Sequence, residues 1–145
     1  MTGPAAPDAL LVAVEFSPSS LRAVEVATSW LAPGAEVTLV HVIDTALAAR
    51  IEASGIATRA EAIAKMRSLA ERELAAIGGT GGREVSSMVV EGVPFAEIVK
   101  IANDLDCGLI VLGSRATDVG LEQVLFGGTA EKVLRAARRP VLCVP

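Results

Sequence analysis

The chain has 145 residues, enough for one domain with a sizeable core and too few for two ordinary domains, so we treat residues 1–145 as one domain. Hydrophobic residues make up 52% and aromatic residues only 3%, so Ala, Val, Leu and Ile must build most of the core. The net charge of -4 gives no general electrostatic attraction to nucleic acid or to an anionic membrane, which argues against both as partners.

The N-terminal residues MTGPAAPDAL include no basic segment, and the apolar run that follows ends at Glu15, too early for a signal peptide or a membrane span. We therefore expect a cytoplasmic protein. Cys107 and Cys143 lie far apart without a CxxC pattern, and His41 is the one histidine, so the spacing predicts no metal site. We interpret both cysteines as small apolar filler and His41 as a structural or surface residue.

Five apolar runs rich in β-branched residues predict strands. They lie at Ala9–Val14, Val37–Val42, Val85–Val90, Leu109–Leu112 and Val141–Val144. The first, fourth and fifth are almost continuously apolar, which is typical of strands that are covered on both faces in a parallel sheet.

The first two long helical patterns have clear start signals. The first begins where Ser17 can cap and Pro18 can take the first helical position, and it ends near residues 33–34. Before the second lies Asp44–Ile56, an Ala-rich segment for which we favour a local helix or disorder over a mobile flap. The second helix starts at a capping box from Thr58 to Glu61 and ends in GGTGG.

Two further helices complete the pattern. One follows Pro94 and the other ends before Pro140, which cannot continue a helix. The expected inner residues of these helices are Ile98, Ile101, Ala102, Ala130, Val133, Leu134 and Ala137. Because strand and helix alternate throughout, we expect a three-layer, doubly wound α/β fold with right-handed crossovers.

In such a sheet, ligands bind outside the carboxyl ends of the strands, where the strand order reverses. Glu15 follows the first strand, and Gly113, Ser114 and Arg115 follow the fourth. We expect Gly113 to adopt a backbone conformation barred to larger residues and to expose the amides that follow. The Arg115 guanidinium suits phosphate oxygens, or it is a solvated loop charge.

The last helix starts at Gly127, Gly128 and Thr129, and its first amides and dipole suit an anion. Alternatively, Glu131 bonds back to the Gly128 amide and these residues only start a helix. Glu15 likewise has two interpretations, since its carboxylate can accept hydrogen bonds from a sugar or an adenine amine, or can cap the first helix.

Four segments follow one specific pattern over nearly the whole chain. They are LLVAVEFSPSSLRAVEVA, VTLVHVID, VVEGVPFAEIVKIA and the closing half that begins LIVLGSR and ends GGTAEKVLRAARRPVLCV. Together they resemble the universal stress protein family. The resemblance implies a five-stranded parallel sheet in the order 3-2-1-4-5, so that Glu15 and Gly113 become neighbours.

Members of that family that bind ATP carry Gly-x-x-Gly, nine residues, and then Gly-Ser or Gly-Thr. They also place an acidic residue and a strand-two valine around the nucleoside, which correspond here to Glu15 and Val42. The phosphate-side residues that the resemblance implies are Gly113, Ser114, Arg115, Gly127, Gly128 and Thr129.

This chain departs from the family pattern in its phosphate loop. Ala116 replaces the second glycine, the spacer before Gly127 holds ten residues, and Gly128 replaces the hydroxyl residue, which Thr129 can supply one position later. Glu15 stands where the family more often has Asp, which moves the carboxylate outward by one methylene.

We therefore expect a universal stress protein that binds ATP or a related adenine nucleotide, with or without Mg²⁺, as a regulatory ligand in a stress response. The alternative is a protein of the same fold that binds no nucleotide and acts through dimerisation and a protein partner. No GxxxxGK[ST] motif occurs, so we expect any ATP hydrolysis to be slow and incidental. The short apolar strand Val141–Val144 at the sheet edge predicts a homodimer.

Overall fold

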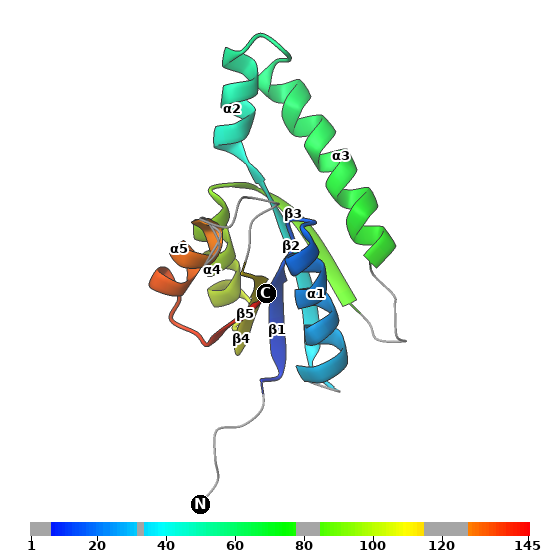
Figure 1. Ribbon diagram of the computed structural model, residues 1–145, viewed down its shortest axis with the longest axis vertical. Coiled ribbons are helices and arrows are strands. Elements are labelled where there is room, and N and C mark those ends of the chain that lie inside the picture. Colours follow the sequence, from blue (N-terminus) through cyan, green and yellow to red (C-terminus); the bar gives the residue numbers. More distant parts are fainter. Residues whose placement is uncertain (1–6, 32–33, 78–84, 115–127) are drawn as a thin grey trace, which may run out of the picture.

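The computed structural model describes residues 7–31, 34–77, 85–114 and 128–145. Within these residues, five parallel strands form one sheet in the order β3-β2-β1-β4-β5 (Figure 1). The strands are β1 Ala9–Ala13, β2 Glu36–Asp44, β3 Val85–Gly92, β4 Leu109–Gly113 and β5 Val141–Val144. This confirms the expected order and places each strand within two residues of its predicted bounds.

Helices cover both faces of the sheet. They are α1 Pro18–Val26, its π-helical continuation η1 Ala27–Leu31, α2 Thr45–Ala53, α3 Arg59–Ile77, α4 Pro94–Asp104 and α5 Gly128–Ala136. One buried cluster joins the sheet to α1 and α3, and a second joins it to α4 and α5, which lie on the opposite side in Figure 1. The predicted three-layer α/β fold is therefore confirmed.

Two helices begin with the predicted caps. The Ser17 hydroxyl accepts a hydrogen bond from the Ser20 amide at 3.3 Å, with Pro18 in the first turn of α1. At α3, the Glu61 amide donates to the Thr58 hydroxyl at 3.1 Å, and this hydroxyl donates to the Glu61 carboxylate at 2.9 Å. Local side-chain chemistry thus sets both starts.

The segment after β2 forms the helix α2. A local helix was one of the two interpretations that we favoured for this segment; the other was disorder. The Asp44 carboxylate caps α2 and accepts hydrogen bonds from the amides of Ala46 at 2.9 Å and Leu47 at 3.4 Å. Helices α2 and α3 form a hairpin that extends beyond the carboxyl edge of the sheet (Figure 1). The hairpin therefore provides a wall above the ends of the strands.

Successive residues of β1 point to opposite faces and join different halves of the core. Leu10 and Val12 pack with α1 and α3, whereas Leu11 packs with α4 and α5. One predicted inner residue is wrong, since Leu134 is 41% exposed, while Ala130 and Val133 of the same helix are buried. The short helix α5 buries the face with Ala130 and Val133, which packs with α4 and the sheet.

Both cysteines belong to the core beneath α4 and α5, as expected of small apolar residues: Cys107 is fully buried and Cys143 is half-buried. None of the helices in the described ranges combines the length and the apolar character that a membrane span requires.

Candidate functional site

A cavity of about 450 Å³ opens at the carboxyl edge of the sheet. The ends of β1, β2 and β4 form its floor, and residues of α3, α4 and α5 form its walls. The strand order reverses here, since β1 pairs with β2 on one side and with β4 on the other. The cavity therefore occupies the position at which doubly wound sheets bind their ligands.

Most of the predicted site residues meet at this cavity, although they come from distant parts of the chain. Those that line it are Glu15, Val42, Gly113, Gly128 and Thr129. Arg115 and Gly127 lie outside the described residues, as does the altered position Ala116. The predicted proximity of Glu15 and Gly113 thus follows from the pairing of β1 with β4.

Ser114 does not present its backbone amide to the cavity. The amide donates to the carbonyl of Val144 at 2.8 Å, and the residue is only 7% exposed. The expectation that this amide is open to a phosphate is therefore wrong, because the sheet hydrogen bonding between β4 and β5 continues to Ser114.

Gly113 lies where the start of α1 packs against the end of β4. Its φ does not lie in the left-handed region, so the expected special backbone conformation is wrong. A Cβ atom here would instead collide with the Ser19 hydroxyl and approach the Ser20 amide nitrogen to 2.6 Å. Glycine allows the start of α1 to pack directly on the end of β4.

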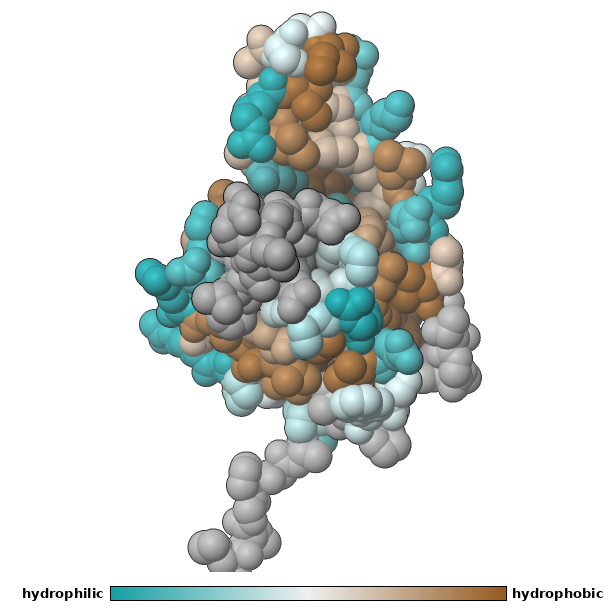
Figure 2. All heavy atoms as spheres, viewed as in Figure 1, coloured by the Kyte–Doolittle hydropathy of each residue, from teal (hydrophilic) through white to brown (hydrophobic). Residues whose placement is uncertain are grey.

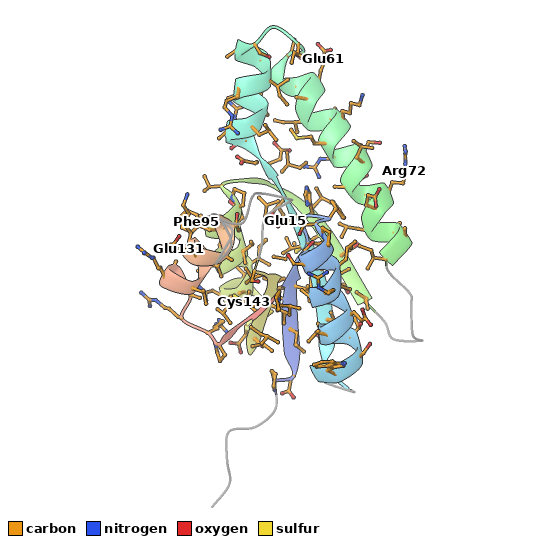
Figure 3. The ribbon with its side chains drawn as sticks, in the orientation of Figure 1. Glu15, Glu61, Arg72, Phe95, Glu131 and Cys143 are labelled. Atoms are coloured by element: carbon orange, nitrogen blue, oxygen red, sulfur yellow. The ribbon has the colours of Figure 1, made fainter. Side chains whose placement is uncertain are left out.

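Glu15 lies at the end of β1 beside the start of α1 (Figure 3). Its carboxylate accepts a hydrogen bond from the Ser17 hydroxyl at 3.1 Å, and that hydroxyl is the N-cap of α1. Glu15 therefore supports the cap without being the cap itself. Because the residue is exposed and lines the cavity, its carboxylate can accept further hydrogen bonds from a ligand.

The loop after β1 is shaped by residues that the sequence analysis did not assign to the site. Phe16 has a φ of 66°, and its ring stacks on His41 with 4.9 Å between the ring centroids. His41 Nδ1 lies 2.7 Å from the carbonyl oxygen of Val14. All three residues line the cavity, so His41 has a place in the site beyond the structural role expected of it.

The start of α5 provides the second predicted feature. A Cβ added to Gly128 would meet no atom within 4 Å, so this position has room for a side chain. The Glu131 carboxylate accepts a hydrogen bond from Arg135 at 2.9 Å, and in the described part of the chain no bond joins it to the Gly128 amide. The described Glu131 carboxylate is thus engaged by Arg135, and the suitability of this helix start for an anion stays a prediction.

Helix α3 contributes one face to the cavity wall. Met66, Leu69, Ala70 and Glu73 follow the spacing that places residues on one side of a helix. Leu47 of α2 joins them; it is 39% exposed and Leu69 is 45% exposed, and Figure 2 shows apolar surface on this hairpin. Sequence reasoning missed this wall because only the tertiary fold brings α3 over the strand ends.

The charged side chains among the described cavity residues are all carboxylates. They belong to Glu15, Asp44 and Glu73. The described residues hold no cluster of three or more His, Cys, Asp and Glu side chains that could bind a metal ion. Asp118 and Glu122, which the sequence places between Gly113 and Gly127, lie outside the described ranges.

Comparison with known proteins identifies relatives of this chain. The sequence profile of the universal stress protein family matches residues 8–145. Universal stress protein MJ0577 of Methanocaldococcus jannaschii is 38% identical over 63 residues, which are 43% of this chain and 38% of that protein. The part of each curated relative that aligns with this chain is less than half of that relative's length.

Solved structures share the fold over almost the whole chain. The structure of MJ0577 matches with a TM-score of 0.82 and 28% identity, and covers 97% of this chain and 96% of that one. The universal stress protein from Archaeoglobus fulgidus in complex with dAMP matches with a TM-score of 0.62 and 23% identity, over 94% and 96% of the two chains. At 23% identity, the similarity to the Archaeoglobus fulgidus protein concerns the fold alone.

Proposed function

Because the chain belongs to the universal stress protein family, we propose that the cavity at the carboxyl edge of its sheet binds an adenine nucleotide as a regulatory ligand in a stress response. One observation carries the proposal: the Glu15 carboxylate after β1 and the first residues of α5, Gly128 and Thr129, line the same cavity. A nucleotide needs this combination, since its sugar donates hydrogen bonds and its phosphate is an anion.

At the nucleoside end, the Glu15 carboxylate accepts hydrogen bonds from ribose hydroxyls, and Val42 provides apolar contact for the base. The cavity volume of about 450 Å³ lies within the range of roughly 300–1,000 Å³ that is common for small-molecule sites. At the phosphate end, the backbone of Gly128 and the Thr129 hydroxyl supply donors at the positive end of the α5 dipole. A bound ATP would bring Mg²⁺ with its phosphates.

The proposal is tested on the purified full chain. The protein is denatured by heat and the released small molecules are separated by chromatography; refolded or nucleotide-stripped protein is then titrated with ATP in a calorimeter, with and without Mg²⁺. We expect either co-purified adenine nucleotide or saturable binding heat. Absence of both at millimolar ATP would contradict the proposal and favour the alternative, a protein that acts without a nucleotide.

A variant links binding to the cavity. Glu15→Gln should weaken adenine nucleotide binding about tenfold, because hydrogen bonds to a charged group each contribute about 1.5–3 kcal/mol. The matched control is Glu36→Gln. Glu36 begins β2 and therefore lies at the amino ends of the strands, far from the cavity at their carboxyl ends. Equal affinities of the two variants would show that the ligand does not contact Glu15.

We further propose that two copies of the chain associate through β5. This strand pairs with β4 on one side and forms an edge of the described sheet on the other. An apolar edge strand with unpaired backbone groups favours association with a second copy. In this arrangement the nucleotide site of each copy remains at the far end of the strands from the N-terminus.

A further inference from the structure

The sheet ends in two edge strands of unequal length. Within the described residues, β3 forms one edge with 8 residues and β5 forms the other with 4. An edge strand presents backbone N–H and C=O groups with which a second chain can pair, and a longer strand presents more of them. By length alone, β3 is therefore the stronger site for association between copies of this chain. What lies along β3 decides whether a second strand can reach these groups.

The hydrogen bonds of β2 establish the direction of its backbone groups. The Glu36 amide donates to the Asp8 carbonyl at 2.9 Å. Further along β2, the Val40 carbonyl accepts a hydrogen bond from the Val14 amide at 2.8 Å. The even-numbered residues of β2 thus bond to the chain of β1. Because successive residues of a strand direct their backbone groups to opposite sides, the odd-numbered residues of β2 bond to β3.

The register between β2 and β3 then identifies the outward groups of β3. His41, an odd-numbered residue of β2, is paired with Val89. In a parallel pair, such a residue bonds to the two neighbours of its partner, which here are Met88 and Val90. Val89 therefore directs its amide and carbonyl away from β2, and the same alternation applies along the strand. The outward residues of β3 are Val85, Ser87, Val89 and Glu91.

Arg67 of α3 occupies part of this outward edge. Helix α3 packs against β3, and Arg67 reaches the strand with both arms of its guanidinium. Nη1 donates to the outward carbonyl of Val89 at 3.3 Å, and Nη2 donates to the Glu91 carboxylate at 2.8 Å. A guanidinium keeps its charge in proteins, and its rigid fork suits two acceptors at once. A positive charge is thus fixed along β3, with one backbone acceptor of the edge already in use.

We propose that Arg67 closes the β3 edge to strand addition by a second copy of this chain, which leaves strand addition to the β5 edge. A pairing strand would have to displace the guanidinium from the Val89 carbonyl and cover its charge, and burial of a charge without its partners costs more than one strand hydrogen bond returns. Charged side chains along an edge are a common protection against such pairing. The residues of β5, VLCV, include no charge. Arg67 does not line the cavity, so this role is independent of nucleotide binding.

The experiment removes this charge and measures the mass of the full chain by light scattering over a range of protein concentrations. The Arg67 side chain is 36% exposed, and a surface ion pair contributes little to stability, so Arg67→Ala should stay folded; circular dichroism checks this. Its mass should rise to about twice that of the wild type or more, because each copy then has a second edge for pairing. A monomeric wild type would give a dimer, and a dimer formed through β5 would give longer open chains of copies.

The matched control is Arg72→Ala. Arg72 is an exposed residue of the same helix and points away from the sheet (Figure 3), so this variant loses the same charge without a change at β3. Its mass should equal that of the wild type. An Arg67→Ala chain with the mass of the wild type at every concentration would overturn the inference, as would an equal rise in Arg72→Ala.

A second substitution shows whether the new association uses β3. Ser87 is exposed and its amide points away from β2, so Ser87→Pro removes an outward donor and leaves the bonds to β2 intact. The double variant of Arg67→Ala with Ser87→Pro should return to the mass of the wild type. A mass that stays raised would contradict the role of Arg67, because the association would then arise at another surface or from unfolding.

Discussion

Single residues at the strand ends shape the cavity, and Gly113 illustrates how. The start of α1 approaches the end of β4 so closely that no side chain fits between them. The same helix start carries Ser17, the N-cap of α1, whose hydroxyl donates to the Glu15 carboxylate. The glycine therefore allows α1 to pack at this side of the cavity, whereas the phosphate contact that the family resemblance implies for it stays a prediction.

Gly113→Ala should destabilise the fold by about 1–3 kcal/mol, the usual cost of an additional methyl group in a close-packed contact. Gly128→Ala is the matched control, because a Cβ there meets open space and alanine is a better helix former than glycine. Urea denaturation of both variants checks the prediction. Equal midpoints for Gly113→Ala and the wild type would show that the contact is not rigid.

The buried thiol of Cys107 makes the stability of the fold depend on pH. Burial raises the pKa of Cys107 above its ordinary value of 9.0, an effect that Arg139 opposes and Asp106 reinforces. Burial also raises the pKa of Cys143. Since the folded state holds the thiol proton more tightly than the unfolded state, this contribution to stability is complete below pH 9.0 and is lost as the pH rises further.

We therefore expect the free energy of unfolding of the wild-type chain to fall more between pH 8 and pH 10 than that of the variant Cys107→Ala. The measurement is the free energy of unfolding in urea at the two pH values, which separates the pH effect from the constant cost of the smaller side chain. The same loss in both proteins would mean that the buried thiol does not contribute.

At the scale of elements, the helix starts connect local sequence to the site. Ser17 begins α1 beside Glu15, Asp44 begins α2 beside the cavity, and Thr58 begins α3, whose later turns form the wall. The caps of Ser17 and Thr58 were predicted from the sequence because they depend on residues three positions apart, whereas the Asp44 cap was found only in the structure. The direction in which each helix then runs is set by packing.

Ser17→Ala should destabilise the chain by about 1 kcal/mol, because the Ser20 amide loses its capping acceptor. It should also weaken nucleotide binding moderately, since the Glu15 carboxylate loses the hydroxyl that orients it. Ser68→Ala, an exposed change on α3, serves as the control. Thermal unfolding and ATP titration test the two effects, and a variant as stable as Ser68→Ala would contradict the capping role.

For the whole molecule, the outer side of β5, an edge strand of the described sheet, is the surface that we propose for a second copy. Ser114 and Ile110 of the β4 side donate to the carbonyls of Val144 and Pro140. Backbone groups alternate along a strand, so those of Val141 and Cys143 point away from β4. These groups are the ones that a second β5 strand would pair with.

Cys143→Pro should therefore convert a homodimer to a monomer while the chain stays folded, because proline removes an outward amide and leaves the bonds to β4 intact. Light scattering at high concentration gives the mass, and circular dichroism confirms the fold. A wild-type chain that is already monomeric, or a variant that remains dimeric, would contradict association through β5.

Local periodicity and neighbouring side chains are enough to predict the order of the strands and helices, their approximate bounds and the caps of α1 and α3. The ends of the strands and the start of the last helix pointed to four of the cavity residues, Glu15, Gly113, Gly128 and Thr129, and the resemblance added the strand order and Val42. Only the tertiary structure decided that Gly113 serves a close helix contact, that the Ser114 amide belongs to the sheet, and that Glu73 and His41 face one cavity. These features depend on how elements distant in sequence pack together, which no local pattern encodes.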